Sequence, residues 1–312
     1  MAEQATEART EPAGEADRGR IEPGAGREPG EARLDPRGAL PNLVVIGAQK
    51  CGTSGLHFYL DCHPEISMSS PKELNFFIRE RNWQRGLDWY REYFDPSSPV
   101  RGESSPNYTT YPHHLGVPQR MREVVPDAKV IFLVRDPIER IAAHWVHNYA
   151  KRRERGDLRD TLLHPNTTYV LRSQYALQLR QFLNHYPESQ TLVLEQEDLR
   201  LRRVDTLRGV FSFLGVDPGF EHPRFHRERH RSSRKRRATW LGTQAQSLRR
   251  TRWGSRTPKV LWNALDVGLP LGKPIPRPDV REALGPEVLE VLHEDAERLR
   301  ELTGRRFESW SV

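Results

Sequence analysis

The sequence predicts an α/β fold with three layers, in which helices flank a mainly parallel central sheet. Two short apolar runs, at residues 43–46 and 129–134, have the continuous hydrophobicity that is typical of strands buried on both faces. A segment with the apolar spacing of a helix follows each run. Strands that alternate with helices are typical of a parallel sheet, and 312 residues give room for one large domain or two small ones.

The first strand is expected to end at Gly47. Residues 53–62 are then expected to form a helix, because Leu56, Tyr59 and Leu60 are spaced to bury one face. Similar patterns mark the later elements, which are a short strand ending near Glu103, a strand at 129–134, a helix to about 153, an amphipathic helix at 173–186, a strand at 191–194, a helix at 204–214 and a last helix at 286–302 that Gly304 caps.

Two segments differ from the rest of the chain. Residues 1–40 contain no Phe, Trp or Tyr and are expected to form a disordered leader, which leaves residues 41–312 as a single domain. Eight of the fourteen residues at 224–237 are Arg or Lys. We expect a basic, irregular flap at 224–278, which is either a solvated surface or a lid over an anionic ligand.

Composition excludes several classes of protein. No apolar run reaches the roughly eighteen residues of a transmembrane helix, and the N-terminus lacks the apolar core of a secretory signal. Cys51 and Cys62 are the only cysteines, which excludes a disulfide framework and a cysteine-based zinc site. A reducing, cytoplasmic location is therefore expected. The net charge of +7 indicates an anionic partner, such as a phosphate ligand, an acidic glycan, nucleic acid or a membrane surface.

Residues 47–54 (GAQKCGTS), here named the phosphate loop, join the first strand to the first helix. Backbone N–H groups at such a helix start bind phosphate, and Gly52 lets the backbone approach an anion closely. Thr53 and Ser54 add hydroxyl donors. In a Walker loop the lysine follows the glycine, whereas Lys50 precedes it. The sequence therefore predicts a P-loop-like fold; a helix start without any ligand is the alternative.

A second candidate anion site follows the strand at 129–134. The turn Arg135-Asp136-Pro137 leaves the carboxyl end of this strand. In a parallel sheet that is also the edge of the phosphate loop, where ligands bind. Arg135 is therefore placed to bind a second phosphate of the same ligand, unless it only forms a surface salt bridge with Asp136 or Glu139.

Both segments resemble a known family. GAQKCGTSGLHFYLDCHPEI resembles the 5′-phosphosulfate loop of sulfotransferases that use 3′-phosphoadenosine-5′-phosphosulfate (PAPS), and RDPIERIAAHW resembles their 3′-phosphate-binding segment. Further similar segments are PKELNFF, ESSPNY, QYALQLRQFL, LEQEDL, FLGV and ELTGRRFESW. The resemblance covers about residues 42–215 and 287–310, and is nearest to heparan-sulfate-type and bacterial carbohydrate sulfotransferases.

The resemblance implies a role for each site residue, with PAPS as co-substrate and no metal. Lys50 would contact the phosphosulfate, and Arg135 would hold the 3′-phosphate. The 5′-phosphate would be held by Cys51, Gly52, Thr53 and Ser54. The family's serine eight residues after the arginine is Ala143 here. Arg135 then needs a further partner, for which His144 and the arginines of the flap are candidates.

The catalytic base is expected near the end of the loop that follows the first helix. The resemblance places the family's catalytic carboxylate at Glu73, and Lys72 would keep it ionised. A surface Lys–Glu pair is the alternative interpretation. His113 and His114 are rival bases, because aryl and steroid sulfotransferases use a histidine between the two nucleotide segments.

These features predict sulfuryl transfer from PAPS to an acceptor hydroxyl of a glycan, lipid or secondary metabolite, with an amine less favoured. The basic flap favours an acidic acceptor. A P-loop small-molecule kinase that uses ATP and Mg²⁺, with Asp136 on the metal, is the second hypothesis. The third is a non-enzymatic protein that binds nucleic acid or another polyanion through residues 224–237, although no recognised nucleic-acid module is present.

Overall fold

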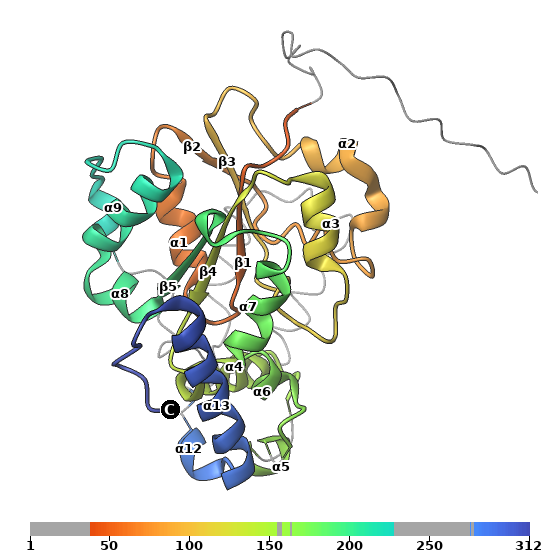
Figure 1. Ribbon diagram of the computed structural model, residues 1–312, viewed down its shortest axis with the longest axis vertical. Coiled ribbons are helices and arrows are strands. Elements are labelled where there is room, and N and C mark those ends of the chain that lie inside the picture. Colours follow the sequence, from red (N-terminus) through yellow and green to blue (C-terminus); the bar gives the residue numbers. More distant parts are fainter. Residues whose placement is uncertain (1–37, 155–157, 163, 228–274, 276–277) are drawn as a thin grey trace, which may run out of the picture. The chain divides into compact units, whose positions relative to one another are not determined.

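A five-stranded parallel sheet organises the protein, as the apolar runs predicted (Figure 1). The computed structural model describes residues 38–154, 158–162, 164–227, 275 and 278–312. The strands are β1 (Leu43–Gly47), β2 (Ile66–Met68), β3 (Val100–Ser104), β4 (Lys129–Val134) and β5 (Thr191–Glu195). They lie in the order β2-β3-β1-β4-β5, and every neighbouring pair is parallel.

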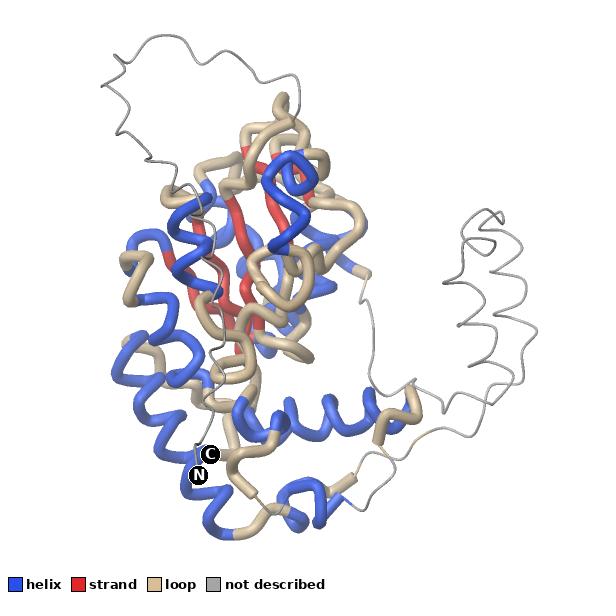
Figure 2. The backbone as a smooth tube through the Cα atoms, turned by 90° about the vertical axis from the view of Figure 1, so that its right-hand side faces the viewer, coloured by secondary structure: helices blue, strands red, loops and turns tan. Residues whose placement is uncertain are grey.

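Helices cover both faces of this sheet, which confirms the predicted α/β class. Figure 1 shows α1, α8 and α9 on one side and α3 and α7 on the other, and Figure 2 shows helices on both sides of the strands. The helices are α1 (Thr53–Leu60), α2 (Gly86–Arg91), α3 (Val117–Val124), α4 (Pro137–Ala150), α5 (Leu158–Leu162), α6 (Thr168–Leu171), α7 (Tyr175–Leu183), α8 (Gln196–Leu201), α9 (Arg203–Leu214), α12 (Val280–Ala283) and α13 (Pro286–Thr303).

Most predicted elements lie within a few residues of their expected bounds. The helix expected at 173–186 is shorter at both ends, because α7 covers Tyr175–Leu183, and another element caps its N-terminal N–H groups. Asp295 of α13 accepts hydrogen bonds from the N–H groups of Ala176 and Leu177, at 2.9 and 3.0 Å, so α13 fixes the position of α7. Gly304 has a left-handed φ of 64° and caps α13 as expected.

The core explains why the central strands are continuously apolar. Residues 43–46 of β1 and 130–134 of β4 are fully buried between the two helical layers. A second apolar cluster lies among α4, α5, α6, α12 and α13 and includes Ile141, Leu162 and Val288. It extends the fold beyond the sheet and supports the helices that follow the carboxyl edge.

Most of the predicted leader, residues 1–37, and most of the predicted flap lie outside the described residues, and both stay predictions. Of the flap, the structure describes the start: residues 223–226 form a short 3₁₀ helix whose Phe225 is buried. In the described part of the chain, no helix combines the length and the apolar character needed to cross a membrane.

Gly47 is required by its close contact with the loop that follows β3. A Cβ atom built at residue 47 would lie 2.1 Å from Oγ1 of Thr109 and 3.1 Å from its Cβ. We expect Gly47→Ala to lower the free energy of unfolding by about 1–3 kcal/mol through overpacking, measured by urea denaturation.

The additional change Thr109→Ala removes the nearest atom and should restore part of that loss. Gly209→Ala in α9 is the matched control, because no neighbouring atom lies within 4 Å of its new Cβ. Unchanged stability of Gly47→Ala would contradict the described contact.

Candidate active site

The carboxyl edge of the sheet brings the predicted site segments together. β1 and β4 are parallel neighbours, with Gly47 paired with Phe132. The phosphate loop and the turn at Arg135 therefore leave the sheet at the same edge, as predicted. The strand order reverses beside β1, where a crevice for a ligand is expected in this class of fold.

The phosphate loop reverses the chain through two left-handed residues, Lys50 with a φ of 77° and Gly52 with a φ of 95°. Gly52 is also close to the start of α8, because a Cβ there would lie 3.2 Å from Cγ of Gln196. Within the described part of the chain, the N–H groups of Gly52, Thr53 and Ser54 donate to no protein acceptor. These three donors at the start of α1 are suited to bind an anion.

Cys51 differs from its neighbours because its side chain belongs to the core. Its thiol is 3.4 Å from the hydroxyl of Tyr175, and burial raises the thiol pKa to about 11, so the thiol is neutral. Its N–H group donates to the carbonyl of Ala48 at 3.2 Å. Tyr175 is fully buried in this contact.

Arg135 carries a buried donor that the protein does not satisfy. Nη2 donates to Oε2 of Glu139 at 2.7 Å, whereas Nε is buried and has no hydrogen-bond partner among the described residues. A buried donor without a partner costs about 1–3 kcal/mol, so a ligand oxygen at this position would be stabilising. This orphaned Nε fits the predicted contact with a second phosphate.

Asp136, the metal ligand in the kinase hypothesis, is used as a cap. Oδ1 accepts from the N–H group of Glu139 at 2.9 Å, and Oδ2 accepts from that of Ser311 at 2.6 Å. The carboxylate therefore fixes the start of α4 and the C-terminal segment. Both of its oxygens are engaged within the fold.

Sequence reasoning missed Glu197, which lies at the same edge after β5. Its Oε1 accepts from the N–H group of Asp136 at 3.4 Å, and its Oε2 is buried without a partner among the described residues. Burial raises the pKa of this carboxyl. The signal in the sequence was its place directly after a strand, in the LEQEDL segment.

His144 and the arginines of the flap were the two candidates for a further partner of Arg135. His144 is buried, and burial together with the charge of Arg140 holds its pKa far below the usual range. A neutral His144 cannot add positive charge to a phosphate site, although its Nδ1 lacks a partner among the described residues. The flap arginines beyond residue 227 lie outside the described residues.

Arg140 is another functional residue that the sequence did not single out. It is fully buried, donates through Nε to Oγ of Ser173 at 2.5 Å, and donates through Nη2 to the carbonyl of Tyr169. Its Nη1 is 3.5 Å from the carbonyl of Gln49 in the phosphate loop. The guanidinium thus ties the loop to α4 and α6.

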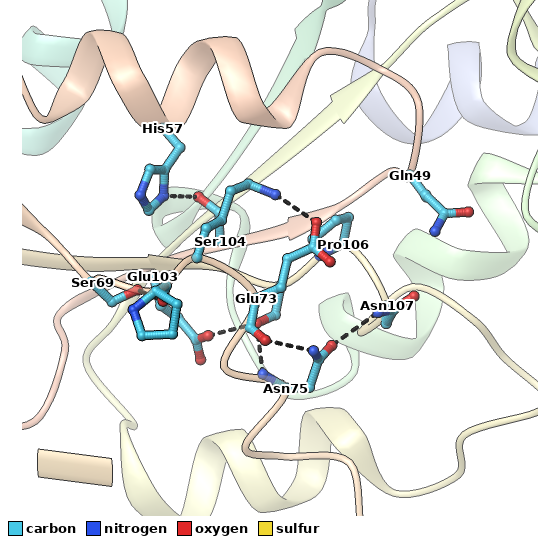
Figure 3. Close-up of polar contacts among 12 residues, drawn as sticks. Gln49, His57, Ser69, Glu73, Asn75, Glu103, Ser104, Pro106 and Asn107 are labelled. Atoms are coloured by element: carbon cyan, nitrogen blue, oxygen red, sulfur yellow. Dashed lines mark hydrogen bonds and ion pairs between the residues drawn. The ribbon is translucent and has the colours of Figure 1, made fainter. Parts of the chain in front are cut away.

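Glu73 lies on the loop after β2, next to the end of β3 (Figure 3). Its N–H group donates to the carbonyl of Ser104 at 3.1 Å, and its left-handed φ is 68°. The carboxylate is 46% exposed and is 2.9 Å from Nζ of Lys72. Glu73 and Asn75 are non-glycine residues with positive φ, a conformation that clusters at functional sites.

His57 of α1 contacts the end of β3, where the carbonyl of Ser104 holds the backbone of Glu73. Its Nδ1 is 2.9 Å from Oγ of Ser104. Burial and the charge of Lys72 lower the pKa of His57 to about 4, while the charge of Glu73 acts in the opposite direction. A neutral imidazole, a lysine and a carboxylate therefore share the space at the end of β3.

The rival bases lie in a different setting. His113 is exposed, and His114 is 3.4 Å from Oε2 of Glu80, with a pKa that burial lowers. His114 lines a cavity of about 180 Å³ together with Tyr111 and Gln178. The role of base stays a prediction for Glu73, and for either histidine as the alternative.

Glu103 precedes Ser104 at the end of β3, and its carboxylate has a structural role. Its fully buried carboxylate accepts hydrogen bonds from Tyr90, Ser105 and Tyr108 at 2.5, 2.6 and 2.7 Å. Burial raises the pKa of this carboxyl, and three donors satisfy its oxygens. Glu103 thereby anchors the strand end that positions Glu73.

Comparison with known proteins gives a consistent result. A model of the sulfotransferase family matches residues 41–222. Bifunctional heparan sulfate N-deacetylase/N-sulfotransferase 3 of Mus musculus is 31% identical over 205 residues, which cover 59% of this chain and 23% of that protein. A sulfotransferase structure from Alicyclobacillus acidocaldarius has a TM-score of 0.63 and 25% identity, and covers 88% of this chain and 100% of that one.

The matched residues are more than half of the chain and contain the phosphate loop, Glu73 and Arg135. The chain spans about a quarter of the length of the curated relatives that it matches. The kinase hypothesis is not favoured, because the matching family transfers sulfuryl groups and Asp136 is a cap. The chain therefore belongs to the sulfotransferase family, as its motifs indicated.

Proposed function

We propose that the protein transfers the sulfuryl group of PAPS to an acceptor hydroxyl of a glycan, lipid or secondary metabolite, with Glu73 as base and Lys50 at the leaving phosphate. The observation that carries this proposal is the placement of Glu73. Its backbone is held by Ser104 at the carboxyl edge, and its carboxylate is half exposed. A carboxylate in that place is accessible to an acceptor and lies beside the helix that follows the phosphate loop.

The residues of the carboxyl edge fit the bisphosphorylated donor. The N–H groups of Gly52, Thr53 and Ser54 are available for the 5′-phosphate, and the orphaned Nε of Arg135 is available for the 3′-phosphate. When bound, PAPS supplies the sulfuryl group and leaves as adenosine 3′,5′-bisphosphate. Cys51 would assist by packing, because its neutral thiol faces Tyr175.

The protein's own contribution to the chemistry is positioning and charge. Glu73 accepts the proton of the acceptor hydroxyl, a role worth about 10²–10⁴ in rate. Lys72 forms an ion pair with Glu73 at 2.9 Å, which places a cation beside the proposed base. Lys50 has the charge to stabilise the leaving phosphate, since the loose transition state expected for sulfuryl transfer, as for phosphoryl transfer, depends mainly on electrostatics.

An acidic carbohydrate acceptor is the finer part of the proposal. The names of the relatives say that they act on heparan sulfate, which supports a glycan but concerns only a part of those proteins. Burial, followed by the charges of Arg140 and Arg81, lowers the pKa of Arg172, while the charge of Glu73 raises it, so a cationic side chain lies within electrostatic reach of Glu73. A cytoplasmic location stays a prediction.

Glu73→Gln tests the base. We expect it to lower transfer from labelled PAPS to an N-acetylated heparosan oligosaccharide or p-nitrophenol by at least about 100-fold, because an amide cannot accept the proton. Binding of adenosine 3′,5′-bisphosphate, measured by calorimetry, should stay within about twofold. Glu301→Gln on the exposed face of α13 is the matched control.

Turnover that survives in Glu73→Gln would exclude Glu73 as the base and assign that role to His113 or His114. Transfer to the free amines of the unacetylated oligosaccharide, with none to hydroxyls, would change the acceptor from a hydroxyl to an amine.

Arg135→Gln tests the second anion site. We expect its affinity for adenosine 3′,5′-bisphosphate to fall by about tenfold or more, because a charge-assisted hydrogen bond contributes roughly 1.5–3 kcal/mol. Its affinity for adenosine 5′-phosphate should change little. Calorimetry of both nucleotides checks this, with the exposed Arg200→Gln as control. Equal losses for the two nucleotides would show that Arg135 does not contact the 3′-phosphate.

A further inference from the structure

Arg172 lies between α6 and α7 and contacts two loops of the carboxyl edge. Its Nη1 donates to Oε1 of Gln49, in the phosphate loop, at 2.7 Å. Its Nη2 donates to Oδ1 of Asn107, in the loop after β3, at 3.4 Å. One guanidinium thus joins the residue next to Lys50 to a loop that lies beside Glu73.

Two asparagines continue this connection to the backbone of Glu73 (Figure 3). Asn107 donates through Nδ2 to Oδ1 of Asn75 at 3.0 Å, and Asn75 donates through Nδ2 to the carbonyl of Glu73 at 2.6 Å. The N–H group of Asn75 donates in turn to Oγ of Ser105 at 3.0 Å. We name Gln49, Arg172, Asn107 and Asn75 the amide chain.

The arginine sets the direction of the whole amide chain. A guanidinium only donates, so the amide oxygen of Asn107 must face it, and the amide nitrogen must face Asn75. The amide nitrogen of Asn75 is then directed to the carbonyl of Glu73, whose left-handed φ of 68° needs support from its surroundings. The orientation of the Glu73 loop therefore depends on a residue about one hundred positions away.

The location of Arg172 is unfavourable for a charge. Burial, followed by the charges of Arg140 and Arg81, lowers its pKa to about 10, and the charge of Glu73 partly opposes this. Its Nε is buried without a partner among the described residues. A charged side chain in such a place is seldom more stabilising than an apolar one. The contacts of Arg172 therefore point to a role other than stability.

We propose that Arg172 is a positioning residue, which through the amide chain holds the Glu73 loop at a fixed place relative to the phosphate loop. The inference rests on the proposed function, in which Glu73 and Lys50 act on the two sides of the transferred group. Loss of Arg172 would leave both residues in the protein but would free the loop that carries the base.

Arg172→Met tests this, because methionine keeps much of the side-chain length and removes every donor. In the nucleotide-free protein, we expect amide hydrogen exchange in peptides covering residues 73–78 to become about tenfold faster or more. The matched control is Arg180→Met on the neighbouring helix α7, where the arginine is exposed. Its exchange at 73–78 should equal that of the natural chain.

Kinetics separate positioning from donor binding. With PAPS and the N-acetylated heparosan oligosaccharide or p-nitrophenol, kcat of Arg172→Met should fall about 10- to 100-fold. Its Kd for adenosine 3′,5′-bisphosphate should stay within about threefold. Asn75→Ala should lower kcat as well, and the double variant should lose no more than the worse single variant, because both changes break the same chain.

Unchanged exchange at 73–78 in Arg172→Met would overturn the inference while leaving the proposed function standing. A Kd that weakens as much as kcat falls would also overturn it, since Arg172 would then be a donor ligand. Absence of nucleotide binding and turnover in the natural chain would instead reject the proposed function. If Arg172→Met does not fold, Asn107→Leu breaks the same chain, and the same exchange measurement decides.

Discussion

The parallel pairing of β1 with β4 is the constraint on which the site depends. It places the carboxyl ends of two buried strands side by side, so the phosphate loop and the turn at Arg135 leave the sheet at the same edge. Without this pairing, each turn would be an ordinary helix start or surface ion pair. β3, on the other side of β1, ends at Ser104, which holds the backbone of Glu73, so three neighbouring strands position the phosphate loop, Arg135 and Glu73.

Burial determines which of the titratable groups at the carboxyl edge of the sheet are charged. Cys51, His57 and His144 are buried enough to stay neutral at neutral pH, with thiol and imidazole pKa values shifted in opposite directions. Arg135, Arg140 and Arg172 remain cationic and are held by hydrogen bonds to fixed acceptors. Positive charge is therefore concentrated where an anionic donor is proposed to bind, at groups that need little rearrangement.

Sequence patterns predicted the fold class and the shared sheet edge of residues 47–54 and the Arg135 turn, because those features depend on local periodicity and on which residues follow each strand. β2 was missed because three residues, Ile66–Met68, are too short to show a period. Glu197 and Arg172 were missed because they contact residues 61 and 123 positions away in the sequence, and local patterns do not reveal such contacts. The resemblance supplied Glu73, and the contacts that hold it came only from the structure.

A crystal structure of the protein with adenosine 3′,5′-bisphosphate tests the central claim most directly. The account predicts the 5′-phosphate at the N–H groups of Gly52, Thr53 and Ser54, and the 3′-phosphate within about 3 Å of Nε of Arg135. A nucleotide bound at another place, or a 3′-phosphate that leaves Arg135 paired only with Glu139, would contradict the claim that one ligand joins the two turns.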